Sequence, residues 1–190
     1  MVFCAAAISL AATAQQPLEE ATLAGGCFWC LEEALEKIPG VVSATSGYTG
    51  GSTKSPTYEQ VSGGRTGHTE AVRIRFDRSK VSYAQVLDMF WRNIDPLDAG
   101  GQFCDRGSQY RAAIFVHDEN QRRLAEQAKQ AIIDSRRFKE PIVTEITAAG
   151  PFYLAETYHQ DYYKKNPLQY RFDKFNCGRV QRLAKLWSRD

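Results

Sequence analysis

Residues 18–48 read LEEATLAGGCFWCLEEALEKIPGVVSATSGY, and the fold class follows from the pattern in this segment and its continuation. The segment predicts a strand, a helix and a second strand, at residues 18–25, 29–38 and 41–48. Gly25-Gly26 separates the first strand from the helix, whose apolar residues recur at helical spacing while charged residues fill the other face. Pro39-Gly40 ends the helix, because proline cannot continue it. The chain therefore begins with a β-α-β unit.

The elements downstream extend this unit to a β-α-β-β-α-β order. Residues 68–76 alternate between apolar and polar side chains, which predicts a strand with one buried face. Ser82 and Gln85 form a capping box at the start of the next helix. The remaining elements are predicted as helix 83–91, strand 110–117, a helix that Asp118 caps and that ends near Phe138, strand 141–146, helix 155–165 ended by Pro167, and helix 179–187. This order is that of the ferredoxin-like folds and predicts an α+β protein with a mixed or antiparallel sheet, helices on its faces and a C-terminal extension.

The composition of the chain is that of a globular protein. Its 190 residues include 43% hydrophobic and 24% charged side chains, which excludes a disordered chain, a collagen and a coiled-coil rod. Lys and Arg total 24 against 22 Asp and Glu, so the net charge is +2. Such a balance gives no electrostatic basis for binding nucleic acid or for stable association with an anionic membrane. The length favours one domain, at residues 17–190.

The N-terminal segment has features of an export signal. Residues 2–14 form an apolar stretch too short to span a bilayer as a helix. The stretch ends in Ala-Thr-Ala at residues 12–14, a pattern of the kind that precedes signal cleavage, although no Lys or Arg precedes Leu10. We therefore expect residues 1–16 to be an export signal or a disordered N-terminus, and cleavage would remove Cys4. The protein would then be periplasmic or secreted, with the cytoplasm as the alternative.

Cys27 and Cys30 form the segment with the clearest chemical meaning. Cys27 follows a glycine pair and lies where a helix begins, so unpaired backbone N–H groups and the helix dipole are expected to favour its thiolate and lower its pKa. Cys30 lies one turn further on, close enough to form a disulfide with Cys27. The residues alone leave a static crosslink or a buried thiol pair open. A zinc site is disfavoured, because the histidines His68, His117 and His159 form no ligand pair.

A series of ordered motifs resembles the A-type peptide methionine sulfoxide reductases. The motifs are Gly26-Cys27-Phe28-Trp29, Gly47-Tyr48 with Gly50-Gly51, Tyr58-Glu59-Gln60-Val61, Gly67-His68-Thr69-Glu70-Ala71-Val72, Asp95-Pro96, Gly107-Ser108-Gln109-Tyr110-Arg111 with Ile114-Phe115, and Ala155-Glu156-Thr157-Tyr158-His159-Gln160-Asp161-Tyr162. Several motifs in order are far more specific than any one of them. The resemblance implies an enzyme that reduces the S epimer of methionine sulfoxide, free or in proteins, and so repairs oxidised proteins without a metal or another cofactor.

The resemblance also implies a role for each site residue. Cys27 would attack the sulfoxide sulfur, and Glu70 would donate a proton to the leaving oxygen, since an apolar site would keep it protonated. The residues expected to hold the substrate are Phe28, Trp29, Tyr58, Asp105 and Tyr110. The first two would enclose the methyl group, and the tyrosine hydroxyls would bind the sulfoxide oxygen. His159 is expected only to pack or to orient other groups, and Arg111 to pair with a nearby carboxylate.

A reductase of this family needs a second thiol that condenses with the sulfenic acid on Cys27. Many members carry glycine where this chain has Cys30 and use a C-terminal cysteine instead, a role that Cys177 could fill here. Cys30 needs no movement of the chain to reach Cys27, so we expect it to be the first partner. Cys104 replaces an expected polar residue beside Asp105 and stays a third candidate.

Two other functions stay open at this point. A general thiol–disulfide oxidoreductase could use Cys27 and Cys30, and a methionine-binding module could use the aromatic residues without any chemistry. Neither explains the ordered motifs. As partners of a reductase we expect oxidised proteins and a thioredoxin or thioredoxin-like reductant, and we expect the protein to be a monomer.

Overall fold

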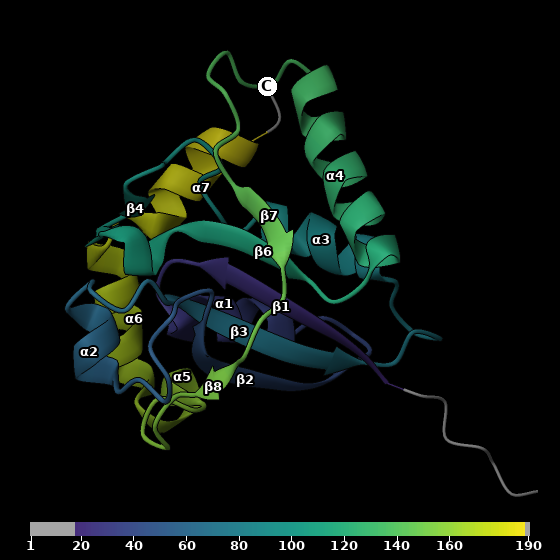
Figure 1. The fold of residues 1–190 in the computed structure, drawn as a ribbon. Coiled ribbons are helices and arrows are strands. Elements are labelled where there is room, and N and C mark those ends of the chain that lie inside the picture. The colour runs from purple at the N-terminus through teal and green to yellow at the C-terminus, as the bar shows by residue number, and fades with distance from the viewer. Residues whose placement is uncertain (1–17, 189–190) are drawn as a thin grey trace, which may run out of the picture.

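Six strands form the central sheet in the computed structural model, which describes residues 18–188 (Figure 1). The predictions for residues 1–16, including the export signal, lie outside this part of the chain. The strands are β1 (Glu19–Gly25), β2 (Val41–Thr49), β3 (Thr69–Phe76), β6 (Ala112–Val116), β7 (Glu145–Ala148) and β8 (Tyr153–Leu154), with β4 (Gly101–Gln102) and β5 (Asp105–Arg106) in a separate hairpin. The helices are α1 (Phe28–Glu36), α2 (Tyr58–Ser62), α3 (Tyr83–Trp91), α4 (Glu119–Asp134), α5 (Tyr162–Lys165), α6 (Pro167–Asn176) and α7 (Arg179–Trp187), with a 3-10 turn η1 at Ser108–Tyr110.

The sheet has the strand order β7-β6-β1-β3-β2-β8. Its neighbouring strands are antiparallel, except for the parallel pair β6–β7. The prediction of an α+β protein with a mixed sheet is therefore confirmed. The strands β1, β2, β3 and β6 hold the four middle positions and, with α1 and α3, follow the predicted β-α-β-β-α-β order. The short helix α2 and the β4–β5 hairpin are inserted into two of the loops.

The main core lies between the sheet and the helices α1, α3 and α4, which contact one another in series. Val72, Ile74 and Phe76 of β3 are fully buried in this core, while Arg73 and Arg75 alternate with them. The alternating sequence predicts this arrangement, because successive side chains of a strand point to opposite faces. Burying each large apolar side chain stabilises the fold by about 1.5–3 kcal/mol. None of the described helices is both long and apolar enough to cross a membrane.

Polar caps begin the helices at the predicted positions. Ser82 accepts the backbone N–H of Gln85, which completes the predicted capping box of α3. Asp118 accepts the backbone N–H of Gln121 at 2.8 Å and opens α4. That helix ends at Asp134 rather than near residue 138, because Arg136 adopts a left-handed conformation with φ 51°. The strand predicted at residues 141–146 begins later, as β7.

The prediction of one helix over residues 155–165, ended by Pro167, is wrong. Only α5 is helical in that range, and Pro167 is the first residue of α6. Proline is well tolerated there because the first residues of a helix have no intrahelical partner for their N–H groups. The Gln160 side chain instead bonds the backbone of Ser46 and Ala155, which holds the preceding segment in a non-helical form. The predicted helix α7 is confirmed, and Gly178, with φ 70°, forms the turn before it.

Candidate active site

The turn between β1 and α1 places Cys27 at the start of α1. Gly26 has φ 79°, a conformation that favours glycine, and a Cβ atom there would lie 2.6 Å from the Cβ of Gln102. Cys27 is the N-cap residue, and its carbonyl oxygen accepts the backbone N–H of Cys30 at 3.1 Å. The thiol therefore lies at a helix N-terminus, where the sequence predicted it.

The thiols of Cys27 and Cys30 share a hydrogen bond and titrate as a pair. This hydrogen bond is the first cause that raises the pKa of Cys27, followed by burial and by charges that include Glu70. The same bond lowers the pKa of Cys30 to about 6. Burial acts in the opposite direction, while the positive charges of Arg179 and Lys174 lower the pKa further. The expectation of a lowered pKa for Cys27 is therefore wrong for this arrangement. These causes favour a negative charge on Cys30, which lies near Arg179 and Lys174, over one on Cys27, which lies near the carboxyl groups of Glu70 and Asp105.

Glu70 lies on β3 near the thiol pair and is only 3% exposed. Its carboxyl group accepts the backbone N–H of Phe28, the first residue of α1, at 3.0 Å. Burial raises the pKa of Glu70 to about 8, and the hydrogen bond from Phe28 offsets this only in part. The carboxyl group is therefore protonated at neutral pH and can act as an acid next to Cys27.

Aromatic side chains form a wall beside the thiols. Phe28 is buried, and its ring centroid lies 4.9 Å from that of His159. Trp29 donates its indole N–H to Nδ1 of His159 at 3.1 Å and stacks on Tyr162, with ring centroids 3.7 Å apart. His159 thus orients Trp29, the kind of role that the sequence suggested. The wall offers an apolar surface suited to a methyl or thioether group.

Tyr58, Tyr110 and Asp105 come to the same site from α2, η1 and β5. Burial raises the pKa of Tyr58 to about 12 and also raises that of Tyr110, and the next cause for both is Glu70. Burial raises the pKa of Asp105 as well. Both phenols therefore keep their protons at neutral pH, and their hydroxyl groups can donate hydrogen bonds to an oxygen atom near Cys27.

Cys104 and Cys177 form a disulfide across 73 residues of sequence, while Cys27 and Cys30 are free thiols. The sequence suggested Cys177 only as a partner of Cys27, so this pairing differs from the expectation. Cys104 is exposed and lies between β4 and β5, and Cys177 caps the C-terminus of α6. The lining of one cavity of about 130 Å³ includes all four cysteines of residues 18–188, and its residues are Cys27, Trp29, Cys30, Cys104, Asp105, Tyr170, Asp173, Lys174 and Cys177.

The peptide methionine sulfoxide reductase family model matches residues 19–190. The chain belongs to this family. The resemblance that the ordered motifs indicated is thereby confirmed, and several of those motifs contribute residues to the site described above, among them Cys27, Tyr58, Glu70, Tyr110 and His159.

Curated relatives and solved structures agree with this membership. Peptide methionine sulfoxide reductase MsrA of Ligilactobacillus salivarius is 54% identical over 170 residues, which cover 90% of this chain and 98% of that relative. Reduced Mxr1 from Saccharomyces cerevisiae is similar with a TM-score of 0.74 and 30% identity, over 82% of this chain and 91% of Mxr1. Methionine sulfoxide reductase A of Corynebacterium diphtheriae has a TM-score of 0.71 and 33% identity, over 81% of this chain and 77% of its own.

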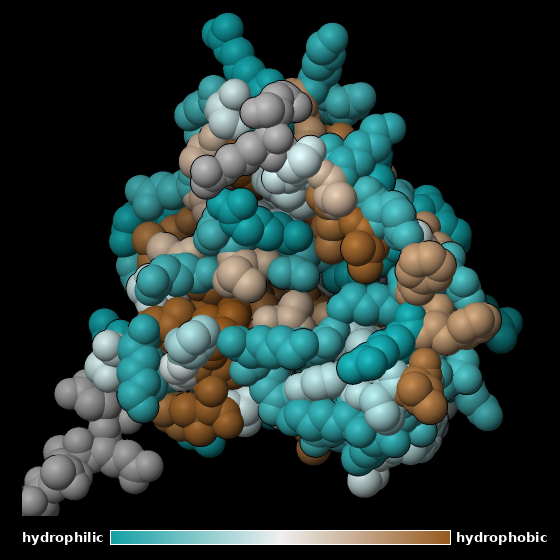
Figure 2. Space-filling model, turned by 180° about the vertical axis from the view of Figure 1, so that it is seen from behind, coloured by the Kyte–Doolittle hydropathy of each residue, from teal (hydrophilic) through white to brown (hydrophobic). Residues whose placement is uncertain are grey.

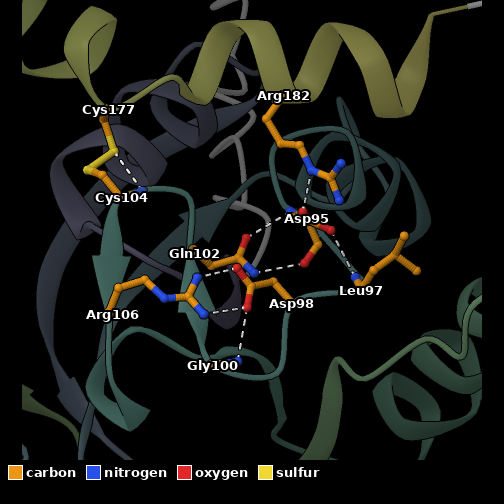
Figure 3. A network of polar contacts seen from close by, with 9 residues as sticks. All are labelled: Asp95, Leu97, Asp98, Gly100, Gln102, Cys104, Arg106, Cys177 and Arg182. Carbon is orange, nitrogen blue, oxygen red and sulfur yellow. Dashed lines mark hydrogen bonds and ion pairs between the residues drawn. A yellow bond between two sulfur atoms is a disulfide. The ribbon is translucent and has the colours of Figure 1, made fainter.

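A polar network fixes the 95–106 loop of the reductase fold (Figure 3). Arg182 of α7 forms an ion pair with Asp95 at 2.6 Å. Gln102 exchanges two hydrogen bonds of 2.8 Å with the backbone of Asp95 across this loop. The disulfide of Cys104 joins the far end of the loop to the end of α6. The C-terminal helices therefore hold the loop at two points, and the loop places Cys104 at the site.

Sequence reasoning missed Arg179, a buried cation beside the thiols. Arg179 is 2% exposed and donates hydrogen bonds to the backbone carbonyls of Gly25 and Asn93, at 3.3 and 2.6 Å. No carboxylate forms an ion pair with it within residues 18–188. Its charge therefore supports the thiolate of Cys30. Nothing in the sequence distinguishes Arg179 from the other basic residues of the C-terminal helices.

Glu156 was also missed as a positioning residue, although it lies in one of the matched motifs. Its carboxylate accepts the backbone N–H of Tyr58 and the hydroxyl group of Tyr48, both at 2.8 Å. It thereby fixes the start of α2 relative to β2. Arg111 pairs with Glu145 at 3.3 Å, which confirms the expectation that it meets a carboxylate.

Proposed function

We propose that this chain reduces the S epimer of methionine sulfoxide, free or in proteins, to methionine. The observation that carries the proposal is the buried carboxyl group of Glu70, protonated at neutral pH and bonded to the backbone at the helix start that holds Cys27. A sulfoxide oxygen is a poor leaving group until it receives a proton, and this acid lies beside the nucleophile. Family membership and the aromatic wall of Phe28 and Trp29 support the same reaction.

In the first step, the Cys27 sulfur attacks the sulfoxide sulfur. The proton of Cys27 passes to the Cys30 thiolate, to which it is already hydrogen-bonded, and Glu70 donates its proton to the sulfoxide oxygen. The oxygen transfers to the Cys27 sulfur, and methionine leaves. Cys27 is thereby oxidised by two electrons to a sulfenic acid, while the substrate sulfur is reduced by two. The hydroxyl groups of Tyr58 and Tyr110 hold the oxygen during this transfer.

In the second step, the Cys30 sulfur attacks the sulfenic acid. A disulfide forms between Cys27 and Cys30, and the hydroxyl group leaves as water with the proton of the Cys30 thiol. Glu70 then regains its proton from solvent. Cys30 is the first partner in this scheme because it already contacts Cys27 through a hydrogen bond and lies one helical turn away.

In the third step, the disulfide moves from Cys27 and Cys30 to Cys104 and Cys177, which we call the outer cysteines. The thiolate of Cys177 attacks the Cys30 sulfur and releases Cys27, and Cys104 then attacks the Cys177 sulfur and releases Cys30. The product is the Cys104–Cys177 disulfide, and the shared cavity of the four cysteines supports this exchange. A dithiol protein of the thioredoxin class supplies the two electrons that reduce it again.

The test uses a peptide with one methionine sulfoxide, resolved into its epimers, with dithiothreitol as the reductant. We expect the wild-type protein to remove one oxygen mass from the S epimer only. Cys27→Ser should remove none, because serine is not a comparable nucleophile at neutral pH. Turnover by this variant, or equal reaction of both epimers, would contradict the proposal. Mass spectrometry after one turnover without reductant reports which cysteines are then paired.

A general thiol–disulfide oxidoreductase is the second candidate, and the exposure of Cys104 is the observation that favours it. Insulin reduction and sulfoxide reduction, both driven by dithiothreitol, separate the two functions. The sulfoxide reaction should depend on Glu70, because only that reaction needs a proton on a leaving oxygen. Insulin reduction that is faster than sulfoxide reduction would favour the second candidate.

A further inference from the structure

Three large apolar side chains of α6 face the solvent in one line. Leu168, Phe172 and Phe175 are 81%, 64% and 66% exposed, and their spacing places them on one face of the helix. We call these three residues the α6 stripe. Seen from behind, Figure 2 shows a band of apolar surface along the right-hand edge, where α6 lies. Val180, 53% exposed at the start of α7, adds a further apolar side chain near the end of the stripe.

The opposite face of α6 is fixed to the body of the protein. Tyr170 is 4% exposed and donates its hydroxyl proton to Glu33 of α1 at 2.5 Å. Lys174 pairs with the same carboxylate at 2.5 Å. The α6 stripe therefore cannot turn inward without breaking these contacts. Single exposed apolar residues are common, but contiguous exposed apolar patches of more than a few hundred Å² mark interaction sites.

The α6 stripe leads to the outer disulfide. α6 ends at Cys177, and the disulfide partner Cys104 is exposed. The backbone N–H of Cys104 donates a hydrogen bond to the sulfur of Cys177 at 3.2 Å. A donor at this position stabilises a thiolate on Cys177 and so makes it the better leaving group. An attacking thiolate therefore meets the sulfur of an exposed residue, Cys104. The hydrogen bond stabilises the thiolate of Cys177, which leaves.

We propose that the α6 stripe is the docking surface for the dithiol protein that reduces the Cys104–Cys177 disulfide. This inference rests on the third step of the proposed function. A reductant of the thioredoxin class must bring its dithiol to the disulfide, and the surface of α6 is continuous with it. Such encounters are short-lived and bury small interfaces, below about 1,200 Å² in total.

Two other occupants fit the surface less well. A second copy of this chain would need about 800 Å² from each partner for a stable dimer, whereas the two aromatic side chains, Phe172 and Phe175, supply about 150–250 Å² each. An oxidised substrate must bring its sulfoxide to Cys27, in a cavity to which α6 contributes Tyr170, Asp173 and Lys174 but none of the three residues of the α6 stripe. The disulfide is the reactive group at which the α6 stripe ends.

The chemistry at this surface is a balanced exchange. The first thiolate of the reductant attacks the Cys104 sulfur, the bond to Cys177 breaks, and Cys177 leaves as a thiolate. The second thiol of the reductant then attacks the intermolecular disulfide and releases Cys104. The reductant ends as a disulfide, and the outer cysteines gain two electrons.

The test compares two reductants in steady-state reduction of a methionine sulfoxide peptide. One is a purified thioredoxin regenerated by its reductase and NADPH, and the other is dithiothreitol. The double variant Leu168→Ser, Phe172→Ser should raise the KM for thioredoxin on the order of tenfold, as expected when central apolar contacts are lost. Turnover with dithiothreitol should not change, because a small dithiol needs no docking surface. Ile133→Ser on α4, a residue 47% exposed and remote in sequence, is the matched control and should change neither value.

A second measurement traps the docked state. A thioredoxin that lacks its second cysteine should stay linked to Cys104, and the double variant should form this link about tenfold more slowly. An unchanged KM for thioredoxin in the double variant, or a link to Cys27 or Cys30, would overturn the inference. So would a raised KM for an oxidised protein substrate alone, or a wild-type dimer in sedimentation that the variant loses. Failure of the wild-type protein with dithiothreitol would instead refute the proposed reductase function.

Discussion

Replacement of Glu70 by glutamine separates proton donation from binding at this site. The amide keeps the shape of the side chain and an oxygen that can accept the N–H of Phe28, as Glu70 does at 3.0 Å. It cannot protonate the leaving oxygen. General acids of this kind contribute about 10²–10⁴-fold to a rate. We therefore expect Glu70→Gln to slow the reduction step by at least about 100-fold, with little change in the dissociation constant for the sulfoxide.

The pH dependence of the wild-type rate gives a second readout of the same group. Burial raises the pKa of Glu70 to about 8, so the acid is protonated below that pH and is lost as the pH rises through it. The pKa of Cys30 is lowered to about 6, so Cys30 is protonated below that pH and can no longer accept the proton of Cys27. The single-turnover rate should therefore be highest between about 6 and about 8. In Glu70→Gln the alkaline decline should vanish.

The same pKa shift also sets an expectation for stability. Because the pKa of Glu70 is raised in the folded protein, from 4.5 to about 8, its burial destabilises the fold progressively as the pH rises between these values. At 1.36 kcal/mol for each pKa unit, the full penalty above that range is at most roughly 4–5 kcal/mol. Glu70→Gln should thus be more stable than the wild type at pH 9 in urea unfolding.

For the kinetic prediction, a normal single-turnover rate of Glu70→Gln with weaker substrate binding would refute the acid role.

The remaining variants probe the thiols and the turn that holds them. Cys30→Ser should accumulate the Cys27 sulfenic acid after one turnover, detected by trapping with dimedone; rapid formation of another disulfide at the wild-type rate would show that Cys30 is dispensable. Cys104→Ser should keep turnover with dithiothreitol and lose at least about tenfold with thioredoxin in a coupled NADPH assay. Gly26→Ala should lower the urea midpoint by an amount equivalent to about 1–3 kcal/mol, because its Cβ would meet Gln102 at 2.6 Å and φ is 79°.

The features that could be predicted from the sequence are those with local causes. The capping box of Ser82 and Gln85 fixes the start of α3 by hydrogen bonds between neighbours, so the first residue of that helix follows from four residues of sequence. The glycine pair before Cys27 likewise forces a turn at the strand end. The presence of Glu70 and the tyrosines at the site followed from the family resemblance, since nothing in their local sequence marks them as buried.

Other features depend on contacts between distant segments. Pro167 is compatible with the end of one helix or the start of the next, and the bonds of Gln160 to β2 decide between them. The pKa of Cys27 also depends on contacts between distant segments. A helix start favours its thiolate, but the hydrogen bond with Cys30, burial and the charge of Glu70 raise the pKa instead, and the last two of these causes require the fold.

The pairing of the outer cysteines follows from the packing of the C-terminal helices. Spacing offered no reason to join Cys104 to Cys177, because 73 residues separate them. The ion pair of Arg182 with Asp95 fixes α7 against the loop that carries Cys104, and the end of α6 then meets that loop. Arg179 follows Cys177 by two residues, so the same junction carries both the outer sulfur and the cation that lowers the pKa of the inner thiol. The junction of α6 and α7 therefore holds one end of the outer disulfide and places a cation near the thiols that α1 carries, which explains how a tail without a strong sequence signal forms one side of the site.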